Sequence, residues 1–255
     1  MNFTEAPRCY SPLQSARRGV QNSLPQIFMS PSLISVEEQR GEGEVDNEDI
    51  RSAFPNTYGL PRVLLKRGDG GGDGKHKEAM RVGVCLSGGQ AAGGHNVIAG
   101  VWDFIKRVHE DSILIGFLDG PHGIYSSNYV SLDANKIDEF RNSGGFDMIG
   151  SGRHKIEKPE EFASSLACCV ALDLDGLVII GGDDSNTNAA QLAEYFAKNS
   201  CKTKVCGAPK TIDGDLKKLP YIPISFGFDS ACRTYSELIG NLGQVSINDD
   251  LTKTK

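Results

Sequence analysis

From residue 81 onward, short apolar runs alternate with longer segments of helical spacing, and this alternation leaves few possible architectures. Short apolar runs bounded by Gly, Asp or Ser and separated by helices are typical of parallel α/β sheets. We therefore expect an α/β fold of three layers with a parallel sheet, whose ligands bind where the strands end. The expected strands are 82–86, 113–118, 176–180 and 203–207, and the expected helices are 97–108, 159–172, a segment capped by Ser185 that ends at 198, and 229–242.

The first 78 residues have a different character from the rest of the chain. They mix Ser, Pro and Gln with an acidic stretch over 36–49 and a Gly/Asp run over 68–74, which indicates an extension with short ordered pieces and a flexible linker. The run ends in Gly-Lys, but Asp69 and His76 stand where a phosphate loop needs Gly and Ser or Thr. The expected division is an extension over 1–78, an α/β domain over 79–242 and a polar tail over 243–255.

Charge and composition exclude several classes of partner. The 255 residues include 27 Lys and Arg against 33 Asp and Glu, so the basic excess that a nucleic acid requires is missing. No apolar run approaches the roughly 18 residues of a membrane-spanning helix, and no secretory signal is expected at the start. Seven cysteines without a CxxC pair favour packed thiols and a cytoplasmic location. The cysteines expected to pack are Cys85, Cys168, Cys169, Cys206 and Cys232.

The first of three loops that follow expected strands is SGGQAAGGHN, residues 87–96. Its four glycines precede a helix, so backbone N–H groups can converge there on an anion. The spacing matches neither GxGxxG nor GxxxxGK[ST], which excludes the ordinary dinucleotide and P-loop sites. A tight turn between strand and helix is the simpler alternative. We expect His95 to support the loop and not to contact phosphate.

The second and third loops carry paired carboxylates. In GGDDSNT, residues 181–187, Asp183 and Asp184 suit Mg²⁺ held jointly with phosphate, although helix capping would also favour such residues. In PKTIDGD, residues 209–215, a carboxylate can accept a substrate hydroxyl proton while Lys210 neutralises phosphoryl charge. A solvated turn has a similar composition. Taken together, the three loops indicate a phosphoryl-transfer site.

The loops resemble those of the phosphofructokinases, specifically the long pyrophosphate-dependent form of plants and protists. The resemblance extends from about residue 13 to 242, and it includes the segments FPNTYG (54–59), GGFDM (144–148), SGRHK (151–155) and SFGFD (225–229). It implies a reversible Mg²⁺-dependent transfer of phosphate from pyrophosphate to fructose 6-phosphate in cytoplasmic glycolysis. It also implies a homo- or hetero-oligomer with phosphofructokinase subunits, whereas the expectation of no nucleic acid and no membrane as partner comes from charge and composition.

The same resemblance implies a role for each matching residue. The amide of Gly89 would contact pyrophosphate, Asp183 would ligate Mg²⁺, and Asp213 would take the proton from the sugar 1-hydroxyl. Substrate contacts or support would come from Thr211, Ile212 and Asp215.

Two further positions are expected to choose the phosphoryl donor, because ATP-using relatives carry Gly at both. The carboxylate of Asp184 places charge and bulk where the α-phosphate of ATP would lie. Lys210 would meet the transferring or leaving phosphate. An ion pair between Asp184 and Lys210 is the alternative explanation for this pair of residues.

The chain also departs from the family pattern. Ala92 stands where Pro is usual, and after Leu242 the resemblance stops, before the motifs that grip fructose 6-phosphate. We therefore expect a truncated chain that lacks a second domain and has impaired activity alone. The alternatives are an ATP-dependent 6-phosphofructokinase and a non-catalytic regulatory subunit.

Overall fold

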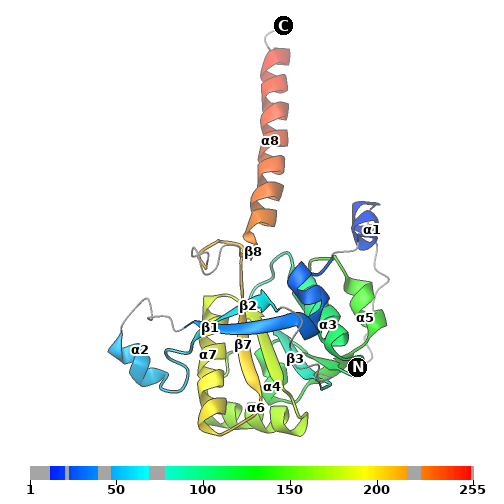
Figure 1. Ribbon diagram of the computed structural model, residues 1–255. Helices are drawn as coiled ribbons and strands as arrows, with labels where there is room; N and C mark the ends of the chain where they lie inside the picture. The colour runs from blue at the N-terminus through cyan, green and yellow to red at the C-terminus, as the bar shows by residue number, and fades with distance from the viewer. Residues whose placement is uncertain (1–11, 21–22, 40–46, 69–77, 217–224, 254–255) are drawn as a thin grey trace.

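A six-stranded sheet lies at the centre of the computed structural model, which describes residues 12–20, 23–39, 47–68, 78–216 and 225–253 (Figure 1). The strand order is β5-β4-β3-β6-β7-β8. All neighbouring strands are parallel except β5, which pairs antiparallel with β4, so the expected parallel sheet is confirmed with one reversed edge. The strands are β3 (Arg81–Leu86), β4 (Ile113–Phe117), β5 (Tyr129–Leu132), β6 (Gly176–Gly181), β7 (Lys204–Thr211) and β8 (Phe226–Gly227).

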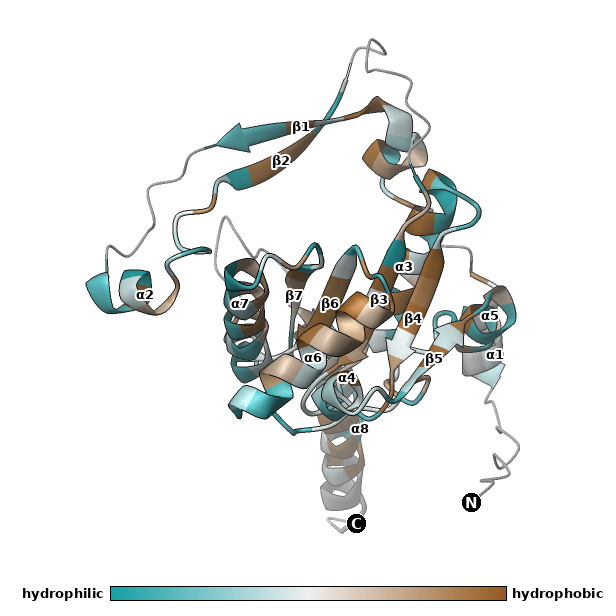
Figure 2. Cartoon of the chain, turned by 90° about the horizontal axis from the view of Figure 1, so that it is seen from below, coloured by the Kyte–Doolittle hydropathy of each residue, from teal (hydrophilic) through white to brown (hydrophobic). Residues whose placement is uncertain are grey.

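Helices cover both faces of this sheet and complete the three expected layers. On one face α3 (Gly94–Val108) and α5 (Ala134–Phe140) pack into a core with Val84 and Leu114. On the other face α4 (Pro121–Tyr125), α6 (Pro159–Ala171) and α7 (Asp183–Lys198) pack into a second core with Phe117 and Leu177. In Figure 2 the hydrophobic strands β3, β4 and β6 lie between the helices, as expected for parallel strands buried on both faces.

The extension before residue 78 contains short ordered pieces, as expected. They are α1 (Pro12–Arg18), the 3₁₀ turns η1 (Gln26–Met29) and η2 (Pro31–Leu33), β1 (Ile34–Gln39), α2 (Glu48–Ala53) and β2 (Arg62–Arg67). Strands β1 and β2 form a separate antiparallel pair. Most of the expected Gly/Asp linker, residues 69–74, lies outside the described residues.

Several expected boundaries were wrong. Helix α7 begins at Asp183 with Gly182 as its N-cap, so Ser185 is not the cap but lies within the first turn. Strand β7 continues to Thr211 because its last residues pair with β8. Helix α8 (Phe228–Lys253) runs through residue 242, so the expected tail does not begin at a break in secondary structure.

The five cysteines that were expected to pack fall into two groups. Cys85, Cys168 and Cys169 are buried, which confirms the expected packing, whereas Cys206 and Cys232 are exposed and the expectation was wrong for them. Strand β7 and helix α8 lie at the edge of the core, where an apolar sequence context does not ensure burial. Among the helices of the described residues, none has the length and apolar character to cross a membrane.

Candidate active site

The sheet order brings the three predicted loops together. Strands β3, β6 and β7 are consecutive neighbours and run parallel, so the loops after them leave the same edge. The register pairs Leu86 with Ile180 and Gly181 with Pro209. The predicted convergence at the carboxyl ends of the strands is therefore confirmed.

Gly88 marks the point at which all three loops meet. Its φ of +85° favours glycine, and a Cβ at this position would lie 3.7 Å from both Lys210 Nζ and Ser185 Oγ. The Ser185 hydroxyl donates to Ser87 Oγ at 2.8 Å, and both serines are buried. Ser185 thus joins the second loop to the first from within the first turn of α7.

Lys210 joins the third loop to the first. Its side chain is buried, and Nζ donates to the carbonyl oxygen of Gly89 at 2.5 Å. Burial lowers the pKa of Lys210, and the nearby Arg153 charge lowers it further, while Asp213 and Asp215 act in the opposite direction. A buried ammonium with one backbone acceptor retains donors for an anion.

Thr211 positions the carboxylate predicted as the proton acceptor. The Thr211 hydroxyl donates to Asp213 Oδ1 at 3.0 Å, and the Asp213 amide donates back to Thr211 Oγ1 at 3.1 Å. Thr211 is buried, whereas Ile212, Asp213 and Asp215 are exposed. A reacting hydroxyl can therefore approach Asp213 from solvent.

Asp183 and Asp184 occupy the first turn of α7, with both side chains exposed. Asp184 pairs with Lys155, Oδ1 to Nζ 3.1 Å, so the alternative of an ion pair with Lys210 does not describe this arrangement. No group of three His, Cys, Asp or Glu able to hold a metal is found in the described residues. The exposed carboxylate of Asp183 suits a Mg²⁺ that takes its other ligands from phosphate and water.

The segment 151–155, which the sequence analysis gave only as part of the resemblance, supplies residues that the predicted site did not include. Its strand-like bridge between Gly152 and Ser87 brings it against the first loop, where the Ser151 hydroxyl donates to the Gly88 carbonyl at 2.6 Å. A Cβ at Gly89 would lie 3.3 Å from an Arg153 guanidinium nitrogen. The basic cluster was visible in the sequence, but nothing local indicated which loop it would join.

His95 is part of the structural support, as expected. Its buried ring accepts the Met148 amide at Nε2, 3.0 Å away, which leaves the proton on Nδ1. Nδ1 lies 2.6 Å from Ser143 Oγ. These contacts hold the start of α3 against the 143–148 segment.

Comparisons with known proteins show what the chain is similar to. The chain matches the phosphofructokinase family over residues 81–248, six residues beyond the expected end of the resemblance. It is 51% identical to the pyrophosphate–fructose 6-phosphate 1-phosphotransferase of Porphyromonas gingivalis, over 91% of this chain and 41% of that protein. It is 47% identical to the beta subunit of the same-named protein of Ricinus communis, over 94% of this chain and 43% of that subunit.

The structure of phosphofructokinase from Saccharomyces cerevisiae supports the fold alone. It matches with a TM-score of 0.51 at 18% identity, over 65% of this chain and 21% of that chain. The chain thus spans about two fifths of the length of the two curated relatives named above.

Proposed function

The chain belongs to the phosphofructokinase family, and from this premise we propose that it carries the phosphoryl-donor site of a pyrophosphate:fructose-6-phosphate 1-phosphotransferase. The observation that carries the proposal is the meeting of three loops at Gly88, where an added Cβ would lie 3.7 Å from both Lys210 Nζ and Ser185 Oγ. The names of the two relatives support the choice of reaction. A cytoplasmic, glycolytic enzyme is part of the same proposal.

The first loop and the N-terminus of α7 would hold pyrophosphate. The backbone N–H of Gly89 and the positive end of the α7 dipole favour an anion, whereas the Gly88 N–H donates to the Gly152 carbonyl at 2.9 Å. Lys210 and Arg153 add two cations at the same place, since both lie against Gly89. Their charge also stabilises the phosphate that leaves after transfer.

Asp213 would act as the base. Its carboxylate accepts the proton of the sugar 1-hydroxyl as that oxygen bonds to phosphorus. The bridging P–O bond of pyrophosphate breaks, and orthophosphate leaves toward Lys210. Thr211 fixes the Asp213 carboxylate, while Ile212 and Asp215 would line the approach of the sugar phosphate.

Asp183 would hold Mg²⁺ together with the diphosphate oxygens. When bound, the ion neutralises charge on the transferring phosphate. Asp184, the next residue, is the proposed barrier to a nucleotide donor. An ATP-dependent enzyme is the second candidate, and the carboxylate at 184 argues against it.

The relatives' names also bear on partners and role. A relative called a beta subunit supports assembly with further subunits of the same family. A non-catalytic regulatory chain is the remaining candidate, and the intact Lys210, Thr211 and Asp213 arrangement favours a catalytic one.

Titration calorimetry tests the donor site without requiring turnover. We expect the 255-residue chain to bind pyrophosphate in the presence of Mg²⁺ and to bind ATP at least about tenfold more weakly, because of Asp184. Asp183→Asn removes the metal carboxylate, so Mg²⁺ should no longer strengthen pyrophosphate binding. Asp173→Asn is the matched control, since Asp173 is exposed and its positive φ of 53° tolerates Asn. Tighter binding of ATP than of pyrophosphate contradicts the donor assignment, and binding of neither contradicts the function.

A further inference from the structure

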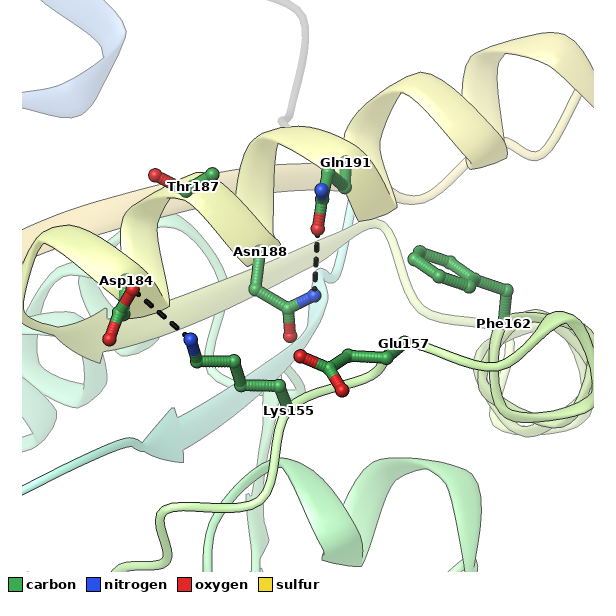
Figure 3. A pocket seen from close by; sticks show the side chains of 7 residues that line it. All are labelled: Lys155, Glu157, Phe162, Asp184, Thr187, Asn188 and Gln191. Atoms are coloured by element: carbon green, nitrogen blue, oxygen red, sulfur yellow. Dashed lines mark hydrogen bonds and ion pairs between the residues drawn. The ribbon is translucent and has the colours of Figure 1, made fainter.

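A cavity of about 320 Å³ adjoins the proposed donor site on the side of α7 (Figure 3). Asp184 lies at one end of it, one residue before Ser185, which contacts the first loop. Phe162 of α6 lies at the other end. The residues that line the cavity are Lys155, Glu157, Phe162, Asp184, Thr187, Asn188 and Gln191.

The Lys155 ammonium points from the 151–157 segment toward the Asp184 carboxylate (Figure 3). The side chains are 42% and 73% exposed, and pairs of that kind contribute at most about 1 kcal/mol to stability. The ion pair therefore matters less for folding than for where it holds the Asp184 carboxylate.

The backbone beside Lys155 is fixed, which limits the positions that its side chain can reach. Asn188 of α7 donates from Nδ2 to the Ile156 carbonyl at 2.7 Å and accepts the Ile156 amide at Oδ1, 2.9 Å away. Ile156 itself is fully buried. Lys155 therefore directly precedes a residue that is anchored to α7, the helix that also carries Asp184.

Charge gives this pair a consequence for a diphosphate ligand. Asp183 and Asp184 are adjacent at the helix end that would receive an anion with several negative charges. A free Asp184 carboxylate would repel that anion, and the neighbouring ammonium reduces this repulsion. A donor longer than a diphosphate, held at Lys210 and Gly89, would have to pass Asp184 and Lys155 to enter the adjoining cavity.

We infer that Lys155 is a donor-specificity residue that acts through Asp184: it holds the Asp184 carboxylate at the end of the cavity, where its bulk excludes a longer donor, and it reduces the repulsion between that carboxylate and pyrophosphate. The inference rests on the proposed function and adds a positioning residue to it. Lys155 has no direct contact with the diphosphate in this scheme, which distinguishes it from Lys210.

The test is titration calorimetry of the whole chain with magnesium pyrophosphate. Lys155→Met should weaken binding about fivefold to tenfold, because Asp184 is then unpaired near the anion. Lys155→Arg should restore most of the affinity. Lys198→Met, at the far end of α7, changes the net charge equally and should change the affinity less than about twofold.

A double-mutant cycle separates action through Asp184 from direct contact. In an Asp184→Asn background, Lys155→Met should change pyrophosphate affinity by less than about twofold. An Asp184→Gly variant should gain binding of magnesium ATP, and adding Lys155→Met to it should reduce that gain, because the released ammonium can then meet the nucleotide phosphates.

The outcomes distinguish the inference from the proposed function. If the unaltered chain does not bind pyrophosphate, both are overturned. If it binds pyrophosphate and Lys155→Met binds equally well, the inference alone is overturned. If Lys155→Met weakens pyrophosphate binding in the Asp184→Asn background as much as it does alone, the inference is also overturned, since Lys155 would then contact the ligand directly.

Discussion

The α/β body and helix α8 differ in how far their apolar side chains are buried. In the body, residues such as Phe117 and Leu177 are fully buried between the sheet and its helices. Helix α8 projects away from the body (Figure 1), and six of its large apolar residues are exposed. They are Tyr235, Leu238, Ile239, Leu242, Val245 and Ile247.

This difference shows which part of the chain is stabilised by its own contacts. Most helical stability in proteins comes from packing of an apolar face, and isolated helices are marginal in water. Within the described residues, the body provides that packing for its own helices but not for the exposed residues of α8. We therefore expect the body to unfold cooperatively and the second half of α8 to exchange its amides faster.

The largest expected contrast is between two leucines. Leu177→Ala opens a cavity in the core under β6 and should lower the free energy of unfolding by about 2–5 kcal/mol. Leu242→Ala, at a side chain that is 68% exposed, should change it by less than about 0.5 kcal/mol. Urea denaturation followed by circular dichroism measures both. Equal losses would mean that α8 is packed in solution.

A second contrast compares two cations, Lys210 in the body and Arg233 on α8. Lys210→Met should weaken pyrophosphate binding at least about tenfold, because a charged hydrogen-bond donor is lost beside the ligand. Arg233→Met removes a side chain that is 84% exposed and pairs with Glu237, and it should leave the affinity nearly unchanged. Titration calorimetry measures both variants, and similar losses would indicate a general charge effect.

The pH dependence of Lys210 sharpens this contrast. Because burial lowers its pKa in the folded chain, the unfolded chain binds more protons as pH rises from that value toward about 10.5. Lys210 therefore destabilises the folded state below this window, and the penalty disappears as pH rises through it. Pyrophosphate affinity should fall over the same window, and Lys210→Met should show neither change. An identical alkaline profile for wild type and variant would contradict this assignment.

The smallest expected contrast compares two carboxylates, Glu194 of α7 and Glu237 of α8. The Glu194 carboxylate accepts hydrogen bonds from the backbone N–H of Asn56 at 3.0 Å and from the Thr57 hydroxyl at 3.0 Å. These bonds hold the extension against α7. Glu194→Gln should destabilise that docking by about 1 kcal/mol, measured by hydrogen exchange of the Asn56 amide. Glu237→Gln should have no effect there.

Acid should release the same contact. Burial raises the pKa of Glu194, but the hydrogen bonds from Asn56 and Thr57 outweigh it and hold the pKa below the ordinary value. The docking is therefore fully stabilised above about pH 4.5 and is lost as pH falls through the lowered pKa. Protection of Asn56 that persists in Glu194→Gln at neutral pH would show that other contacts hold the extension.

The elements that a local pattern defines could be predicted closely. The apolar runs of β3, β4 and β6 and the Pro start of α6 agree with their predicted positions to within one residue. The antiparallel strand β5 and the β1–β2 pair were missed, because pairing between distant segments leaves no periodic signal in either one.

The sequence by itself determined the chemistry of the three loops: glycines for close approach, carboxylates at 183 and 213, and a lysine at 210. Only the tertiary structure decided the partners. In the folded chain Asp184 pairs with Lys155 and not with Lys210, and Ser185 is hydrogen-bonded to Ser87 and does not cap α7. Residue types and spacings are local properties of the chain, whereas these contacts depend on the order of β3, β6 and β7 in the sheet.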